Sequence, residues 1–231
     1  MNQGTIWSAN SPLSWAKVRA MALALTLALA WLGLGQAPYA LAFEFQEGDI
    51  LFEGLETSQS LALVLATGSE YTHCGVVYKG QDGFYVYEAV AVTSLTPLKE
   101  FINRSKIPVI VTRLKDRTAL TPEVLAQMKE KGREIQGKPY DFQFLWSDDH
   151  IYCSELVYKI YQRGAGLELV PLKRFQDYNL SHPVVQALIE KRFPNFPREE
   201  LAVAPADLLK SPYLVKVATI KPKKAKKTKK S

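Results

Sequence analysis

One cysteine in this sequence stands where a thiol could act as a nucleophile. Cys153 follows a polar run that begins at Ser147, and apolar residues recur after it at the spacing of a helix that ends at Gly164. A thiol in the first turn of a helix lies near unpaired backbone N–H groups and the positive end of the helix dipole, which favour the thiolate. We therefore interpret Cys153 as a nucleophile, and a buried cysteine that only fills space is the ordinary alternative.

A thiol nucleophile needs a base, and His73 is the best placed of the chain's three histidines. It lies in a predicted strand, 72–78, which a five-residue turn joins to a second strand, 84–90. In such a hairpin the residue opposite His73 falls near Glu88, give or take two positions. A carboxylate inside an apolar strand is costly to bury without a partner, so Glu88 is expected to orient His73. A strand glutamate at a sheet edge is the alternative.

The second cysteine, Cys74, directly follows His73. Neighbours in a strand point to opposite faces, so Cys74 should point away from whatever His73 faces. This argues against Cys74 as the nucleophile and, more weakly, against a bridge to Cys153. With two cysteines the chain holds either one disulfide or two free thiols.

The remaining elements place these residues in an α+β domain. Periodicity and turn residues predict further strands at 50–52, 109–114 and 213–217, and helices or helical turns at 58–66, 96–101, 122–136 and 205–209. The segment 169–198 carries four prolines through Pro197 and is expected to be irregular. The sequence shows no glycine-rich phosphate loop and no spaced Cys/His cluster for zinc, so we expect no metal and no organic cofactor.

The two ends of the chain differ from its body. Residues 1–42 resemble a secretory signal, with Lys17 and Arg19 before an apolar run and small residues before Phe43. An uncleaved membrane anchor is the alternative. Residues 221–231 hold seven lysines and are expected to be disordered, either without a specific partner or in contact with anionic lipid, wall polymer or nucleic acid through charge alone. Removing the basic residues of both ends from the net charge of +6 leaves −3 for 43–220, the predicted catalytic domain.

Five short motifs carry a resemblance to a known family. They are Gly-Asp-Ile-Leu-Phe at 48–52, Tyr-Thr-His-Cys-Gly-Val-Val at 71–77, Tyr-Glu-Ala at 87–89, Gly-Lys-Pro-Tyr-Asp at 137–141 and Tyr-Cys-Ser-Glu-Leu-Val at 152–157. Their order and spacing resemble the YiiX-like group of circularly permuted papain-like amidases in the NlpC-related superfamily. The resemblance runs from about Glu47 to Val217.

This resemblance implies a fold and a set of roles. The fold would be a circularly permuted papain-like one, in which an antiparallel sheet packs against the helix that bears the nucleophile. Cys153 would be the nucleophile, His73 the base and Glu88 the orienting acid. Tyr140 and Asp141 occupy positions that often lie along the substrate cleft in such enzymes, although a Tyr-Asp pair after Lys-Pro is also ordinary turn chemistry.

The resemblance leaves the substrate open. An exported amidase of this kind suggests a cell-wall peptide or a related amide as the substrate, with no specific nucleic acid partner. Relatives of lecithin retinol acyltransferase share the permuted order and act on lipid esters, so an acyl hydrolase or acyltransferase is the rival. An apolar cleft mouth would favour lipid, and a polar one with Asp141 and Asp148 near the nucleophile would favour an amine-bearing peptide. A non-catalytic binding module on the same fold is the third alternative.

Overall fold

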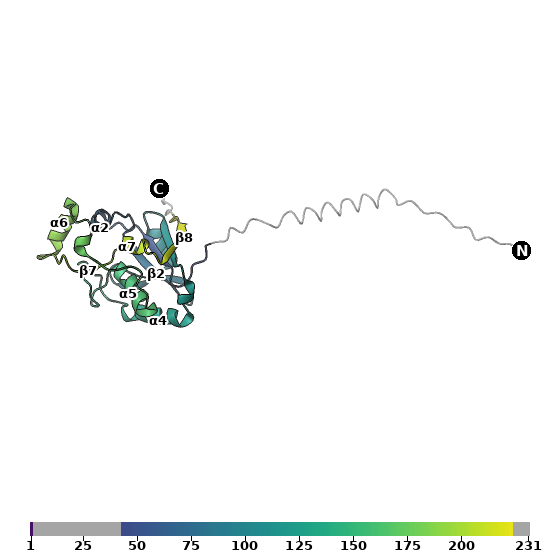
Figure 1. Cartoon of the computed structure of the whole chain (residues 1–231). Coiled ribbons are helices and arrows are strands. Elements are labelled where there is room, and N and C mark those ends of the chain that lie inside the picture. The colour runs from purple at the N-terminus through teal and green to yellow at the C-terminus, as the bar shows by residue number, and fades with distance from the viewer. Residues whose placement is uncertain (2–42, 224–231) are drawn as a thin grey trace, which may run out of the picture. The chain divides into compact units, whose positions relative to one another are not determined.

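The structure is a computed structural model that describes Met1 and residues 43–223 (Figure 1). The predicted signal segment and most of the lysine-rich tail therefore lie outside the described residues, and export and tail contacts stay predictions. The compact unit that holds all of the elements below begins at Phe45. Within the described residues, no helix has the length and hydrophobicity needed to cross a membrane.

A six-stranded antiparallel sheet forms the centre of this unit, with the order β4-β3-β2-β1-β5-β8. Its strands are β1 (Ile50–Glu53), β2 (His73–Lys79), β3 (Phe84–Ala89), β4 (Thr93–Pro97), β5 (Val109–Leu114) and β8 (Leu214–Ile220). The predicted hairpin is confirmed as β2 and β3, in which Val76 pairs with Tyr87. Strand β4 was not predicted and adds an edge beside β3, so Glu88 lies on an inner strand and not at a sheet edge.

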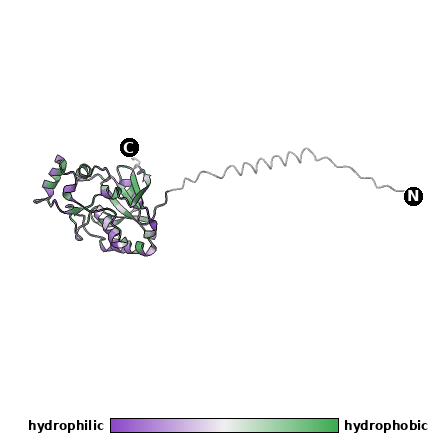
Figure 2. Ribbon diagram, viewed as in Figure 1, coloured by the Kyte–Doolittle hydropathy of each residue, from purple (hydrophilic) through white to green (hydrophobic). Residues whose placement is uncertain are grey.

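Helices α5 (Cys153–Ala165) and α3 (Leu98–Arg104) pack against this sheet, other helices pack on one another, and two short strands pair apart from the sheet. The helices are α2 (Ser60–Thr67), α3 (Leu98–Arg104), η1 (Arg117–Ala119), α4 (Pro122–Glu134), α5 (Cys153–Ala165), η2 (Phe175–Asp177), α6 (Pro183–Arg192) and α7 (Pro205–Leu209), and the two strands are β6 (Lys173–Arg174) and β7 (Leu201–Ala202). Figure 2 shows green, hydrophobic residues gathered in the sheet, whereas α4 and α6 carry hydrophilic residues as well. Helix α5 packs against β2, β3 and α4, and its residues are buried along most of its length.

Helix α5 passes Gly164 and ends at a left-handed Gly166, so the predicted end at Gly164 was wrong. Gly164 serves helix packing instead, because a Cβ atom added there would stand 2.5 Å from the Cα atom of Met128 in α4. The missing side chain lets the two helix backbones approach closely. Gly166, with a φ of 65°, is the residue that the chain reversal requires.

The segment 169–198 is not irregular throughout, because α6 spans Pro183–Arg192. Pro183 stands at the first helical position, where a missing N–H costs nothing, and the His182 side chain accepts from the Val184 amide at 3.2 Å. The count of prolines was misleading because one of them starts a helix. Helix α6 packs against α2.

Candidate functional site

Cys153 is the first residue of α5 and is 3% exposed. The helix start is held by Glu155, which accepts a hydrogen bond from the Tyr152 amide at 3.2 Å. The Ser154 hydroxyl donates to the Val203 carbonyl at 2.7 Å, and the Tyr152 hydroxyl accepts from the Val203 amide at 3.2 Å. These bonds fix the first turn of α5, and with it the Cys153 sulfur, against the strand-like segment near residue 203.

The residues expected to cap this helix, 147–149, bind elsewhere. Asp148 accepts from the buried Lys159 at 2.8 Å and pairs with Arg163 at 2.9 Å. Lys159 also donates to Glu155 at 2.6 Å and to the Ser147 carbonyl. The polar run therefore closes over α5 through a lysine in the middle of the helix and does not cap its N-terminus.

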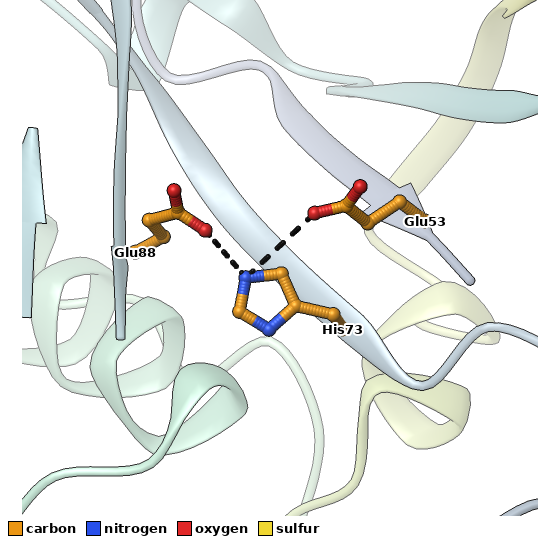
Figure 3. A group of neighbouring side chains, drawn as sticks. All are labelled: Glu53, His73 and Glu88. Carbon is orange, nitrogen blue, oxygen red and sulfur yellow. Dashed lines mark hydrogen bonds and ion pairs between the residues drawn. The ribbon is translucent and has the colours of Figure 1, made fainter. Parts of the chain in front are cut away.

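His73 and Glu88 lie in contact, as the hairpin predicts (Figure 3). The distance from His73 Nε2 to Glu88 Oε2 is 2.7 Å, and both side chains are buried. The pairing of Val76 with Tyr87 sets Glu88 opposite Gly75, two residues along the strand from His73. A Cβ atom on Gly75 would lie 2.5 Å from the Tyr87 carbonyl, so this glycine permits the close approach of β2 and β3 beside the pair.

A second acid and a guanidinium, neither of them predicted, complete the cluster. Glu53 ends β1 directly opposite His73, and its Oε1 atom is 3.9 Å from His73 Nε2. Arg104 donates to both carboxylates, to Glu53 Oε1 at 2.6 and 3.1 Å and to Glu88 Oε1 at 2.8 Å. Thr96 on β4 also donates to Glu88. A glutamate at the end of an apolar strand was a visible signal for Glu53, but nothing local pointed to Arg104.

The electrostatics favour a thiolate paired with an imidazolium. Hydrogen bonding from Cys74 and the positive charge of His73 hold the pKa of the Cys153 thiol well below its usual value, although burial opposes them. Burial would lower the pKa of His73, but the negative charge of Cys153 and the hydrogen bonds to Cys153 and Glu88 raise it to about 10. Burial likewise opposes the ionisation of Glu88, yet His73 and Arg104 lower its pKa to about 2.

Cys74 lies closer to this chemistry than strand alternation suggested. It belongs to the buried core that includes residues of α5, and its nearness lowers the pKa of the Cys153 thiol. Cys153 is the first residue of α5, and it lies near both His73 and Cys74, although these two neighbours in a strand point to opposite faces. The two cysteines are free thiols, and burial beside Cys153 raises the pKa of Cys74 well above its usual value.

The two predicted substrate-binding residues differ in their positions. Tyr140 is buried beside Cys153, whose charge adds to the effect of burial in raising the tyrosine pKa, and its hydroxyl accepts from Gln59 Nε2 at 3.2 Å. The Asp141 carboxylate accepts from the amides of Gln143 and Leu145, both at 2.7 Å. Asp141 thus orders its own loop, and it is absent from the residues that line the cavity described next.

A cavity of about 120 Å³ opens beside Cys153 and Tyr140. Aliphatic and aromatic side chains from α2, α6, the 143–144 loop and the segment near β7 form most of its wall, and Arg192 is the one charged residue in the lining. The apolar lining residues are Ala62, Leu63, Ala66, Phe144, Phe175, Leu180, Val185, Leu188, Ile189, Phe193, Phe196, Ala202, Val203, Ala204 and Pro205.

The comparisons with known proteins agree with this geometry. Residues 44–218 match the family of permuted papain-like amidase enzymes of the YaeF and YiiX type, also called C92. This chain belongs to that family. It is 38% identical over 181 residues to YiiX of Escherichia coli K12, an uncharacterized protein, and the match covers 78% of this chain and 89% of YiiX. The crystal structure of the metalloprotein YiiX of Escherichia coli O157:H7 matches with a TM-score of 0.73 and 37% identity, over 78% of this chain and all of the other.

These matches confirm the expected family and the permuted papain-like fold with an antiparallel sheet and helices. One group of acidic and imidazole side chains in this chain lies close enough together to be compared with a metal site. Glu53, His73 and Glu88 are the one group of three or more His, Cys, Asp or Glu side chains among the described residues whose possible metal-binding atoms all lie within 4.8 Å of one another. Figure 3 shows both carboxylates directed at the same ring nitrogen.

This cluster does not fit a metal ion held by all three side chains. Arg104 already binds both carboxylates, and His73 Nε2 is bonded to Glu88. Among the described residues, Glu53 Oε2 is the one carboxylate oxygen of the cluster without a hydrogen-bond partner. One such oxygen is too few, because a metal bound by a protein takes four or more ligand atoms. An ion bound by both carboxylates would have to displace the guanidinium.

Proposed function

We propose that this protein is a cysteine hydrolase that cleaves an amide or ester through a thioester on Cys153. The observation that carries the proposal is the 2.7 Å bond between His73 and Glu88 in a site where the positive charge of His73 lowers the pKa of Cys153. Nucleophile, base and orienting acid come from α5, β2 and β3, and the family of permuted papain-like amidases agrees with acyl chemistry. The roles of the three residues are those expected from the sequence.

The reaction uses the two ring nitrogens of His73 for different tasks. Since Nε2 is bonded to Glu88, Nδ1 is the nitrogen that serves Cys153. The thiolate attacks the carbonyl carbon, and the imidazolium gives its Nδ1 proton to the leaving nitrogen or oxygen as the acyl bond breaks. Water then attacks the thioester, His73 takes a proton from that water, and the carboxylic acid leaves as the Cys153 sulfur is released.

Two features support stabilisation of the negative oxygen that forms during each attack. The backbone N–H groups in the first turn of α5 lie beside Cys153 and have no partner within the helix. Tyr140 lies close to Cys153, and because its hydroxyl accepts from Gln59, its proton can be donated toward the substrate. Tyr140 therefore keeps its expected place along the substrate path, whereas we assign Asp141 to the loop.

The cavity favours a hydrocarbon chain as the acyl part of the substrate. Its wall next to Cys153 is apolar, and its volume has room for roughly ten water-sized groups, each similar to a methylene. The acidic residues that would have favoured an amine-bearing peptide, Asp141 and Asp148, are bound by loop amides and by Lys159 and Arg163. We therefore place fatty acyl amides or esters first and retain the cell-wall peptide amide as the second candidate.

A series of substrates with one leaving group and acyl chains of two to sixteen carbons tests this proposal. We expect kcat/KM to rise roughly fourfold per methylene, which corresponds to about 0.8 kcal/mol, until the cavity is full near ten carbons. Ala66→Phe should narrow the cavity, so that it slows long chains and spares acetyl substrates, and Cys153→Ala should stop turnover. Cleavage of cell-wall peptides with no dependence on acyl length would favour the second candidate.

A further inference from the structure

Arg104 stands between the two buried carboxylates of the site. It is the last residue of α3, and its Nε and Nη2 atoms donate to Glu53 Oε1 while Nη1 and Nη2 donate to Glu88. The guanidinium carbon lies 4.9 Å from the centre of the Phe101 ring, and that ring lies 5.8 Å from the His73 ring. The arginine therefore contacts both acids, and Phe101 lies near both the guanidinium and the imidazole.

The charges around His73 show why a fixed cation matters. Glu53 from β1 and Glu88 from β3 both face the ring, with Cys153 from α5 on its other side and Cys74 beside Cys153. Without Arg104, two carboxylates would compete for one imidazolium, and like charges so close disfavour each other's ionisation. A planar guanidinium can bind two carboxylates at once with fixed directions, which an ammonium group cannot do.

We propose that Arg104 is a positioning residue of this site: its guanidinium holds Glu53 away from His73 and leaves Glu88 as the single acid that orients the imidazole. The distances agree, because Glu53 Oε1 lies 2.6 Å from Arg104 and 3.9 Å from His73, whereas Glu88 Oε2 lies 2.7 Å from His73. Arg104 thus takes the place between the acids that a metal ion would need. This inference rests on the proposed function, since it assigns a role in the same site.

The test measures the rate of iodoacetamide labelling of Cys153 against pH, located by peptide mass, and needs no substrate. Arg104→Met removes a positive charge near the thiolate and imidazolium pair. We expect the pH at which labelling begins to rise by about one unit or more, because a lost positive charge disfavours the thiolate. Glu53→Gln together with Arg104→Met removes one charge of each sign, so the labelling profile should return toward that of the wild type.

Arg113→Met is the matched control. Arg113 forms a similar ion pair with buried Asp49, with distances of 2.7 and 2.8 Å, elsewhere on the same sheet. Its loss should lower stability without moving the labelling profile of Cys153. Arg104→Lys keeps the charge but loses the planar fork, so it should label like the wild type and turn over the acyl substrate about tenfold more slowly.

Three outcomes overturn the inference. One is that Cys153 of Arg104→Met shows the same labelling rate against pH as Cys153 of Arg113→Met. Another is that adding Glu53→Gln to Arg104→Met does not move the labelling profile back toward that of the wild type. The third is that the purified full chain contains a stoichiometric metal ion and that the Glu53→Gln variant does not. The ion, and not Arg104, would then hold the two carboxylates in place. The proposed function fails separately, if Cys153→Ala retains turnover, and that result leaves the labelling test of Arg104 intact.

Discussion

Glu53 lies directly opposite His73 in the pairing of β1 with β2, yet Glu88 on β3 makes the short contact with the imidazole. His73 Nε2 is 2.7 Å from Glu88 Oε2 and 3.9 Å from Glu53 Oε1, and Arg104 binds that same Glu53 oxygen at 2.6 Å. The pairing of β1 with β2 alone would favour Glu53, whereas the β2–β3 hairpin brings Glu88 near the ring. The helix that follows β4 supplies the arginine that selects between the two.

The contact between Cys74 and Cys153 predicts a measurable change in thiol reactivity. Hydrogen bonding from Cys74 is the largest contribution that lowers the pKa of Cys153, so in Cys74→Ala the iodoacetamide labelling of Cys153 should begin at higher pH. Turnover should persist at alkaline pH. Complete loss of turnover in Cys74→Ala at every pH, with Cys153 still labelled, would show that Cys74 itself takes part in the chemistry.

Glu88→Gln should reveal how this carboxylate links stability to pH. The pKa of Glu88 is lowered from 4.5 to about 2, so its contribution to the free energy of unfolding is complete above pH 4.5 and is lost as pH falls toward 2. The difference in melting temperature between wild type and Glu88→Gln should therefore shrink over that range. Some turnover should remain, because an amide can still bond to the imidazole. A difference that stays constant from pH 6 to pH 2 would contradict the assignment.

Gly164→Ala should destabilise the protein by about 2 kcal/mol. The added Cβ atom would meet the Met128 Cα atom at 2.5 Å, and overpacking of this kind costs more than the roughly 1 kcal/mol that alanine gains over glycine in a helix. Gly166→Ala is the comparison, because its Cβ would meet nothing within 4 Å and the cost of about 1 kcal/mol would come from the positive φ. Urea unfolding of the wild type, Gly164→Ala and Gly166→Ala measures the loss of stability at each position. Equal losses at the two positions would argue against close packing of α4 and α5.

Lys159→Met should cost about 3 kcal/mol or more, because it leaves Glu155 buried without its cation. Burial already raises the pKa of Glu155 to about 7. The penalty in Lys159→Met should therefore be smaller near pH 5, where the carboxyl is protonated, than at pH 8. Glu155→Gln with Lys159→Met removes both charges and should be the more stable of the two variants at pH 8, as chemical denaturation can show.

Much of the site could be predicted because its main parts are local in sequence. The alternation of 72–78 and 84–90 and the short turn between them fix a hairpin, and a hairpin of known length brings His73 near Glu88. The helical spacing after Cys153 likewise places the thiol at the start of α5. Errors arose where residues of the same type have two uses: Gly164 permits packing inside a helix, and Pro183 begins one.

The sequence by itself determined the antiparallel hairpin and the place of Cys153 at a helix start, because strand and helix periodicity act over a few residues. The order of its motifs carried the resemblance to the family and implied the three residues proposed for catalysis. The tertiary structure alone decided which groups surround them. Arg104 reaches Glu88 across 16 positions and Glu53 across 51, and the cavity wall joins α2 to α6, more than a hundred positions apart. Such contacts depend on how the elements pack, and packing is set by the whole set of buried side chains and by no single segment.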